Sequence, residues 1–439
     1  MVALRKELGL WDVVFFTLAG TIGTRWLSAA ANAGPSSITL WILAAAFFLI
    51  PSAFAIAAVS RKYPEQGGLY IWTKRDFGDW PGFLCFWLYW TSIALWFPNA
   101  VMAYSSMAVY ALGPGYTHLA ENRVYVVIAS LIMVWFALGS HLFGLRYGKW
   151  TQVFGGIGSY ALGVVLIIAA FLVFEKRGSA TPMQLKPDWN WATVNFWSQI
   201  AYALTGLELA PMLGSEIRDA GRVLSKSAWI SAAGAGGYYA AATAALLVLL
   251  PPDRINPLYG LAEGGRTAGL ALGLNWLGPL AAIMILMGAI GQFGALGAAA
   301  SRLPFVVGAD RYFPAAFAKL HPKWGTPYWS ILLLAAIASF FLILVQAGET
   351  LRAAYQVLVD LMVLTTFIPF GFIFLSAWKC GTRVSAALGL AVSALAMVCS
   401  LIPTADVKNV WLFEAKLLGG TGLLIGSAWW LFSRARRTR

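Results

Sequence analysis

The first apolar segment of the chain is interrupted in its middle by the sequence Ala19-Gly20-Thr21-Ile22-Gly23-Thr24-Arg25. Glycine weakens a helix, and threonine hydroxyls compete for backbone hydrogen bonds. An arginine inside an apolar segment needs a polar partner. Irregular backbone is tolerated at membrane depth only where protein encloses it or where it lines a cavity. This stretch therefore predicts a broken helix beside a cavity.

A second apolar segment, at 194–214, is interrupted in a similar way by Tyr202-Ala203-Leu204-Thr205-Gly206-Leu207-Glu208, and Pro211 follows within one turn. Paired interruptions at corresponding places in two halves of a membrane protein indicate a binding site at the interface between the halves. We therefore expect the two breaks to lie side by side. The alternative is that the two helices are flexible for unrelated reasons.

The composition places these segments in a lipid bilayer. Hydrophobic residues make up 60% of the chain and charged residues 11%, against roughly 25% charged residues in a soluble protein. A helix needs about 20 apolar residues to cross the hydrocarbon core. The pattern predicts an all-α integral membrane protein with about twelve transmembrane helices and no soluble domain. The expected spans are 10–33, 38–60, 81–112, 122–140, 150–174, 194–214, 227–251, 276–300, 326–347, 349–377, 382–403 and 409–432.

The basic residues indicate how the chain is oriented. Most Lys and Arg residues fall in the loops on one side of the predicted spans, and positively charged loops stay cytoplasmic. We expect both termini to be cytoplasmic, in the cell membrane. Orientation also explains the net charge of +13, so no nucleic-acid partner is expected. No GxxxxGK[ST] phosphate-binding loop occurs, and the scattered cysteines suggest neither a metal site nor another cofactor.

Four motifs, in order along residues 20–327, resemble those of amino acid–polyamine–organocation permeases. They are Ile22-Gly23-Thr24; Tyr63-Pro64-Glu65-Gln66-Gly67-Gly68-Leu69-Tyr70-Ile71-Trp72; Ala201 to Glu208 continuing to Glu216-Ile217-Arg218; and Ser301-Arg302-Leu303 followed by Asp310-Arg311-Tyr312-Phe313-Pro314, His321-Pro322-Lys323 and Gly325-Thr326-Pro327. The resemblance implies the LeuT-like 5+5 inverted-repeat fold. One polytopic domain, 1–439, would contain repeat one at about 10–174, repeat two at about 194–377 and two extra C-terminal helices at about 382–432.

The resemblance also implies a substrate site at the two breaks. A substrate carboxylate would lie against the first break, because helix N-termini and free N–H groups bind anions. A substrate amine would meet carbonyl groups at the second break, where Tyr202 would act as an aromatic gate. Glu208 would act in gating or coupling, unless it is a structural, hydrogen-bonded carboxyl group. The expected substrate-binding residues are Thr21, Ile22, Gly23, Thr24, Arg25, Tyr202, Ala203, Leu204, Thr205 and Gly206.

The sequence departs from the family pattern in two places. Arg25 occupies the position of a family glycine, either as a structural arginine bound to carbonyl groups or as a contact for Glu208 or for an acid group of the substrate. The helix-five lysine of many sodium-independent members is absent, and Ser159 or Tyr160 stands there. Weaker candidates for the cavity wall, each equally able to join helices, are Asn99, Gln292, Phe293 and Gln356.

These features predict a secondary transporter that moves amino acids or related small carboxylate compounds by alternating access. A proton or a counter-substrate would be its coupling partner. The alternatives are a substrate-gated sensor and a polyamine or organic-cation transporter on the same fold. An enzyme is not expected, because the three histidines His118, His141 and His321 are far apart in the sequence and form no catalytic or metal-binding pattern.

Overall fold

The computed structural model describes residues 6–143, 145–183, 186, 191–346, 351–403 and 409–437. This part of the chain is helical, with one isolated parallel β-bridge between Leu8 and Ile217. The α-helices are α1 Leu10–Thr21, α2 Arg25–Asn32, α3 Ser36–Ala44, α4 Ile50–Lys62, α5 Leu69–Phe77, α6 Asp79–Ala108, α7 Arg123–Ser140, α8 Leu145–Arg177, α9 Trp191–Ala203, α10 Ala220–Leu249, α11 Gly260–Leu272, α12 Leu277–Ala309, α13 Tyr328–Gln346, α14 Leu351–Lys379, α15 Arg383–Ser400 and α16 Val410–Arg437. A π-helix, η1 Ala45–Leu49, joins α3 to α4, and the 3-10 helices are η2 Val109–Leu112, η3 Pro114–Glu121, η4 His141–Phe143, η5 Ala210–Glu216, η6 Pro252–Arg254 and η7 Ala315–Ala318.

Each of the twelve predicted spans overlaps at least one of these helices. Within the described residues, seven helices are long and apolar enough to cross a membrane, or eight if the bent pair α1 and α2 counts as one span. α6 falls outside that count although it has 30 residues, because its many Trp, Tyr and Ser residues lower its hydropathy. The chain is therefore a multi-pass helical membrane protein.

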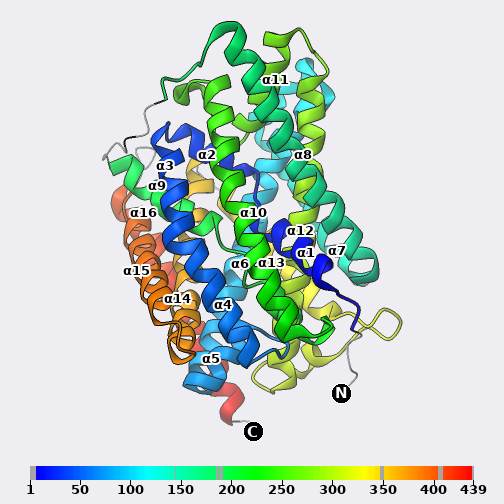
Figure 1. The fold of residues 1–439 in the computed structure, drawn as a ribbon. Coiled ribbons are helices and arrows are strands. Elements are labelled where there is room, and N and C mark those ends of the chain that lie inside the picture. Colours follow the sequence, from blue (N-terminus) through cyan, green and yellow to red (C-terminus); the bar gives the residue numbers. More distant parts are fainter. Residues whose placement is uncertain are drawn as a thin grey trace.

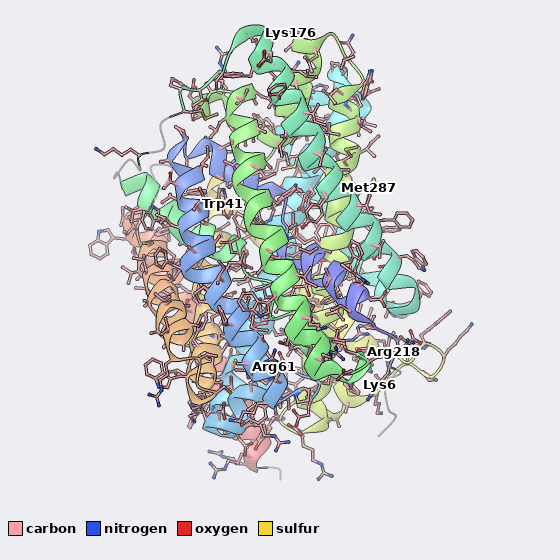
Figure 2. The ribbon with its side chains drawn as sticks, viewed as in Figure 1. Lys6, Trp41, Arg61, Lys176, Arg218 and Met287 are labelled. Carbon is pink, nitrogen blue, oxygen red and sulfur yellow. The ribbon has the colours of Figure 1, made fainter. Side chains whose placement is uncertain are left out.

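The long helices run side by side, and basic residues lie at both ends of the bundle (Figure 1, Figure 2). The first and last described residues lie at the same end (Figure 1). Lys6, Arg61 and Arg218 lie at this end, whereas Lys176 lies at the opposite one (Figure 2). We call the end that carries Lys6, Arg61 and Arg218 the basic end. α11 lies at the opposite end.

Two helices, α5 and α11, lie in segments that the sequence pattern treats as loops. α5 follows the glycine pair Gly67 and Gly68, both with positive φ, and α11 contains two adjacent glycines and an ion pair between Glu263 and Arg266. Both helices have 13 residues or fewer and a mixed polar surface. Short segments of this kind show no membrane-span signal.

Glycine-mediated packing brings α12 close to the first helix. A Cβ atom on Gly155 of α8 would overlap the backbone of Gly291 on α12, so the two helix backbones are in direct contact there. Small residues allow such close approach between membrane helices. The next residue, Gln292, then reaches α1, where its Nε2 lies 3.5 Å from the carbonyl oxygen of Gly20. The structure thus places α12 against the first break.

Candidate functional site

The first predicted break is present. α1 ends at Thr21, α2 begins at Arg25, and the two helices are bent by 40° relative to each other. Ile22, between them, has an extended backbone with φ −84° and ψ 95°. The helical bonding of α1 ends where the Ile22 N–H donates to the carbonyl of Leu18, and a new turn begins where the Trp26 N–H donates to the carbonyl of Gly23. The glycine and threonine residues at 20–24 therefore break the helix, as the sequence predicts.

The second break lies directly against the first. α9 ends at Ala203, and the chain resumes helical structure only at η5. Gly206, between them, has a φ of +128°, and a Cβ atom on it would lie 2.6 Å from Oγ1 and 2.8 Å from Cα of Thr21. The prediction that the two breaks lie side by side is confirmed.

A tyrosine of α10 ties the two breaks together. The Gly23 N–H donates to the hydroxyl oxygen of Tyr239 over 2.8 Å. The same hydroxyl group lies 2.8 Å from the carbonyl oxygen of Thr21 and 3.2 Å from that of Ala203. Its single proton can be donated to either carbonyl. Tyr239 therefore satisfies backbone groups that the two breaks release from helical bonding.

A small cavity lies between the breaks and the inner face of α6. Its volume is about 20 Å³, which is room for about one water molecule and too little for an amino acid. The hydroxyl of Thr21 is buried at this cavity without a hydrogen-bond partner. Buried polar groups are nearly always paired, so such a hydroxyl indicates a place for a ligand or water. The described lining residues are Gly20, Thr21, Trp26, Tyr89, Ser92, Ile93, Trp96, Tyr202, Ala203, Thr205, Gly206, Glu208, Leu209, Gln292, Leu296 and Thr366.

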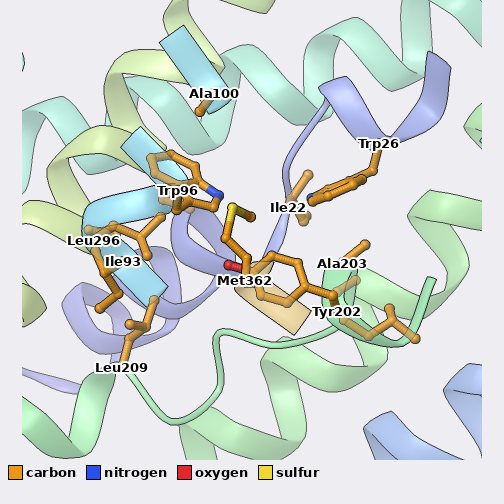
Figure 3. Packing of buried hydrophobic residues seen from close by; sticks show 14 of the residues in the cluster. Ile22, Trp26, Ile93, Trp96, Ala100, Tyr202, Ala203, Leu209, Leu296 and Met362 are labelled. Atoms are coloured by element: carbon orange, nitrogen blue, oxygen red, sulfur yellow. The ribbon is translucent and has the colours of Figure 1, made fainter. Parts of the chain in front are cut away.

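Aromatic side chains line this cavity. The ring of Tyr202 meets the ring of Trp26 edge to face, with 5.8 Å between the centroids. Trp96 of α6 lies on the facing side, and Met362 of α14 lies between Trp96 and Tyr202 (Figure 3).

Glu208 is buried and bonded on both oxygens. Its Oε1 accepts a hydrogen bond from the hydroxyl of Tyr89 over 2.5 Å, and its Oε2 accepts one from the N–H of Gly206 over 2.8 Å. The first bond reaches across to α6, and the second holds the irregular backbone of the second break. Glu208 thus links the break to a facing helix.

Arg25 is fully buried at the start of α2 and contacts α6. Its Nη1 donates to Oδ1 of Asn99, and its guanidinium lies 4.0 Å from the ring centre of Trp26 and 5.7 Å from that of Trp96. The ion pairs found among the described residues do not include Arg25 with Glu208, and the two oxygens of Glu208 accept from Tyr89 and Gly206. The described contacts of the arginine are thus an amide and two aromatic faces.

The other expected site residues divide into two groups. Thr21, Tyr202, Ala203, Thr205, Gly206, Glu208 and Gln292 line the cavity, whereas Ile22, Gly23, Thr24, Arg25 and Leu204 are not among the lining residues. Phe293 packs among Trp96, Phe97 and Tyr104, and Asn99 binds Arg25. The side chain of Gln356 lies outside the described residues.

The wall formed by α6 is the part of the site that the motifs do not indicate. Tyr89, Ser92, Ile93 and Trp96 all line the cavity. Their spacing of three and four residues places them on one face of a helix. The sequence does contain a signal for this wall. A face with polar and aromatic residues within an otherwise apolar helix indicates that the helix lines a cavity.

An all-helical chain with several apolar spans, in which two interrupted helices enclose a cavity, defines a multi-pass membrane transporter. The family model described as amino acid permease matches residues 8–410. The chain therefore belongs to this family, within the amino acid–polyamine–organocation superfamily.

Three relatives that are similar to this chain over most of their length are transporters. An uncharacterised transporter of Legionella pneumophila is 24% identical and covers 98% of this chain and 97% of its own length. The low-affinity putrescine importer PlaP of Escherichia coli is 25% identical, over 77% of this chain and 74% of its own. The serine/threonine exchanger SteT of Bacillus subtilis is 22% identical, over 78% and 77%. The family match and the three relatives together indicate that this chain is a transporter.

Proposed function

We propose that this chain is a secondary transporter of α-amino acids that works by alternating access. Twelve spans would form a LeuT-like pair of inverted repeats, at about 10–174 and 194–377, with two extra helices at about 382–432. The basic end, which carries the first and last described residues (Figure 1), would face the cytoplasm, as would both termini. The observation that carries the proposal is the pair of breaks packed against each other around a cavity with an unpartnered Thr21 hydroxyl.

The breaks offer complementary groups for an amino acid. The start of α2 presents backbone N–H groups and the positive end of a helix dipole, which favour a carboxylate. At the second break, the carbonyl of Tyr202 already accepts from both N and Oγ1 of Thr205. The carbonyl of Ala203 accepts only the weaker 3.2 Å bond from Tyr239. We therefore assign the carboxylate to Gly23 and Thr24, and the amine chiefly to the carbonyl of Ala203.

As it stands in this structure, the space between the breaks is too small for an amino acid. Tyr239 holds the Gly23 N–H that the carboxylate would use, and the cavity has room for about one water molecule. Substrate binding would require Tyr202 and Trp26 to separate and the hydroxyl of Tyr239 to give up the Gly23 N–H. In the same proposal, substrate transport is coupled to the movement of a proton or of a counter-substrate.

Arg25 favours a zwitterionic or acidic substrate over a diamine. A permanent positive charge at the first turn of α2 adds to the positive end of that helix. The carboxylate of Glu208 is engaged on both oxygens. A diamine such as putrescine, which the relative PlaP imports, would meet this charge, and the carboxylate of Glu208 is already bonded on both oxygens. An amino acid can place its carboxylate near α2.

Replacing Arg25 with glutamine tests this assignment. We expect the preference for serine over putrescine, measured as the ratio of their inhibition constants for uptake into proteoliposomes, to fall about tenfold, which corresponds to about 1.4 kcal/mol. Arg25→Lys keeps the charge and should keep the preference. A parent protein that imports putrescine but no α-amino acid would refute the proposed substrate class. An unchanged preference in Arg25→Gln would refute the role of Arg25.

A further inference from the structure

A larger, apolar cavity lies behind the second break, on the side of α9 that faces away from the substrate cavity. Its volume is about 230 Å³, and its described walls come from α3 and η1, from α9 and from α15. α9 packs against both α3 and α15, and the three helices lie along one edge of the bundle (Figure 1). We call this cavity the lateral groove.

The lateral groove has a buried floor and an exposed rim. On the floor, Ile200 and Ala201 are 2% and 3% exposed, whereas Leu43, Phe47 and Leu395 on the rim are 39%, 49% and 45% exposed. The rim residues belong to apolar spans of a multi-pass membrane protein, so the groove opens toward the hydrocarbon of the bilayer. None of the described lining residues carries a charge or a hydroxyl group.

A π-helical turn forms part of the wall. In η1, Ala45–Leu49, the N–H of Ile50 donates to the carbonyl of Ala45, five residues earlier. Pro51 follows directly, has no N–H to offer to the carbonyl of Phe47, and crowds that carbonyl with its ring. Such turns within helices occur frequently at functional sites. Here the turn lies at the groove, because Phe47 is one of the lining residues.

The last turn of α9 separates the lateral groove from the substrate cavity. Trp197, Ile200 and Ala201 line the groove, and their spacing of three and four residues places them on one face of the helix. The next two residues, Tyr202 and Ala203, line the cavity between the breaks. Any molecule in the groove therefore packs against the back of the turn that carries the substrate site.

The size and chemistry of the lateral groove select its occupant. A buried water needs two to four polar partners, and the described lining offers neither a charge nor a hydroxyl group. One turn of a helix, about 10 Å wide and 5.4 Å long, takes up more than the volume of about 230 Å³. An apolar cavity of about 150 Å³ already accommodates benzene, so a stretch of hydrocarbon chain fits the groove.

We propose that the lateral groove binds one acyl chain of a membrane lipid, which packs against the last turn of α9 from behind. Lipid and groove are both apolar, so the transfer of apolar surface from water does not drive this binding. The gain comes from van der Waals contact, because an unfilled groove leaves its lining without partner atoms. A chain in the groove touches protein on several sides, whereas a chain on a convex helix surface touches it on one.

Photo-cross-linking in proteoliposomes tests the site. The probe is phosphatidylcholine with a diazirine in the middle of one acyl chain, diluted in unlabelled phosphatidylcholine, and the cross-linked residues are mapped by peptide mass spectrometry. Residues 40–47, 197–201 and 392–396 should be labelled about tenfold more than Ile132 and Phe136 of α7, which are 66% and 71% exposed and lie outside the groove. A tenfold preference corresponds to about 1.4 kcal/mol.

Matched variants of α15 separate the groove from the general lipid surface. Val392 lines the groove, and Val392→Phe should fill it and lower its labelling about tenfold. Ala396→Leu adds bulk to the same groove and should also lower the labelling, so the result does not depend on the folding of one variant. Val398 is 60% exposed on the same helix and does not line the groove, so Val398→Phe should label as the parent does.

Three results would overturn the acyl-chain site. They are labelling spread evenly over the lipid-facing helices, groove labelling that both Val392→Phe and Ala396→Leu leave unchanged, and a disulfide between two copies of Leu43→Cys that the parent does not form. The last result would place a second copy of the chain in the groove. Cross-linking needs neither substrate nor transport, so a wrong substrate class would leave these outcomes unchanged.

Discussion

Alanine in place of Gly206 is expected to reduce uptake to about one hundredth of the parent rate, because displacement of binding groups by about 1 Å can cost that much. The residue has a φ of +128°, and a Cβ atom would lie 2.8 Å from Cα and 2.9 Å from N of Thr21. Oγ1 of Thr21 would be as close as 2.6 Å, but the other two obstructing atoms are backbone, so side-chain rotation cannot relieve the whole overlap. Backbone strain costs about 1–3 kcal/mol, and overpacking costs a similar amount of about 1–3 kcal/mol. The breaks must therefore move apart.

Gly237→Ala is the matched control for this change. Gly237 lies in α10, has helical backbone, and has no atom within 4 Å of the position of a Cβ. We expect it to keep parent uptake and thermal stability. Uptake by initial rate in proteoliposomes, together with thermal unfolding in detergent, measures both variants. Parent-like uptake by Gly206→Ala would mean that the contact between the breaks does not matter for transport.

Replacing Glu208 with glutamine is expected to lower uptake by about tenfold to a hundredfold, since a lost hydrogen bond to a charged group is worth about 1.5–3 kcal/mol. The carboxylate accepts from Tyr89 and from the Gly206 N–H at the same time. Glutamine has one acceptor oxygen, so its NH₂ group would face one of these two donors. If the NH₂ group faces the Gly206 N–H, the second break loses its backbone support. If it faces Tyr89, whose hydroxyl can accept as well as donate, both bonds remain but neither is to a charged group.

Tyr89→Phe separates the two bonds of Glu208. It removes only the link to α6 and leaves the Gly206 bond, so we expect a smaller loss of uptake than in Glu208→Gln. Glu263→Gln is a control, because Glu263 pairs with Arg266 in α11, away from the cavity. Initial rates and thermal unfolding should be measured for all three variants. A Glu208→Gln variant with parent rates would assign Glu208 a structural role alone.

The sequence was sufficient to predict the two breaks and their contact. Gly20, Thr21, Thr205 and Gly206 weaken helical bonding locally, and this effect does not depend on the rest of the fold. The partners of Arg25 could not be predicted in the same way. Asn99 lies 74 residues away, and whether an amide or Glu208 meets the guanidinium depends on how α6 packs against α2.

The size and wall of the cavity also depend on packing across the whole bundle. Gln292 reaches the first break because α8 and α12 touch through Gly155 and Gly291. Phe293, one residue further on, points into an aromatic cluster and away from the lining. Adjacent polar and aromatic residues look alike as candidates in the sequence, and only the helix orientation separates them.

The measurement that most directly tests the central claim is substrate protection of a cysteine placed between the breaks. Thr21→Cys puts a thiol at the cavity where the Thr21 hydroxyl is unpartnered. The account predicts that this variant transports the best substrate in an uptake panel of amino acids. It also predicts that a small thiol reagent abolishes this transport, and that the same substrate slows the modification at concentrations near its KM. Modification that proceeds equally fast with saturating substrate, or a fully modified protein that still transports, would contradict a substrate site between the two breaks.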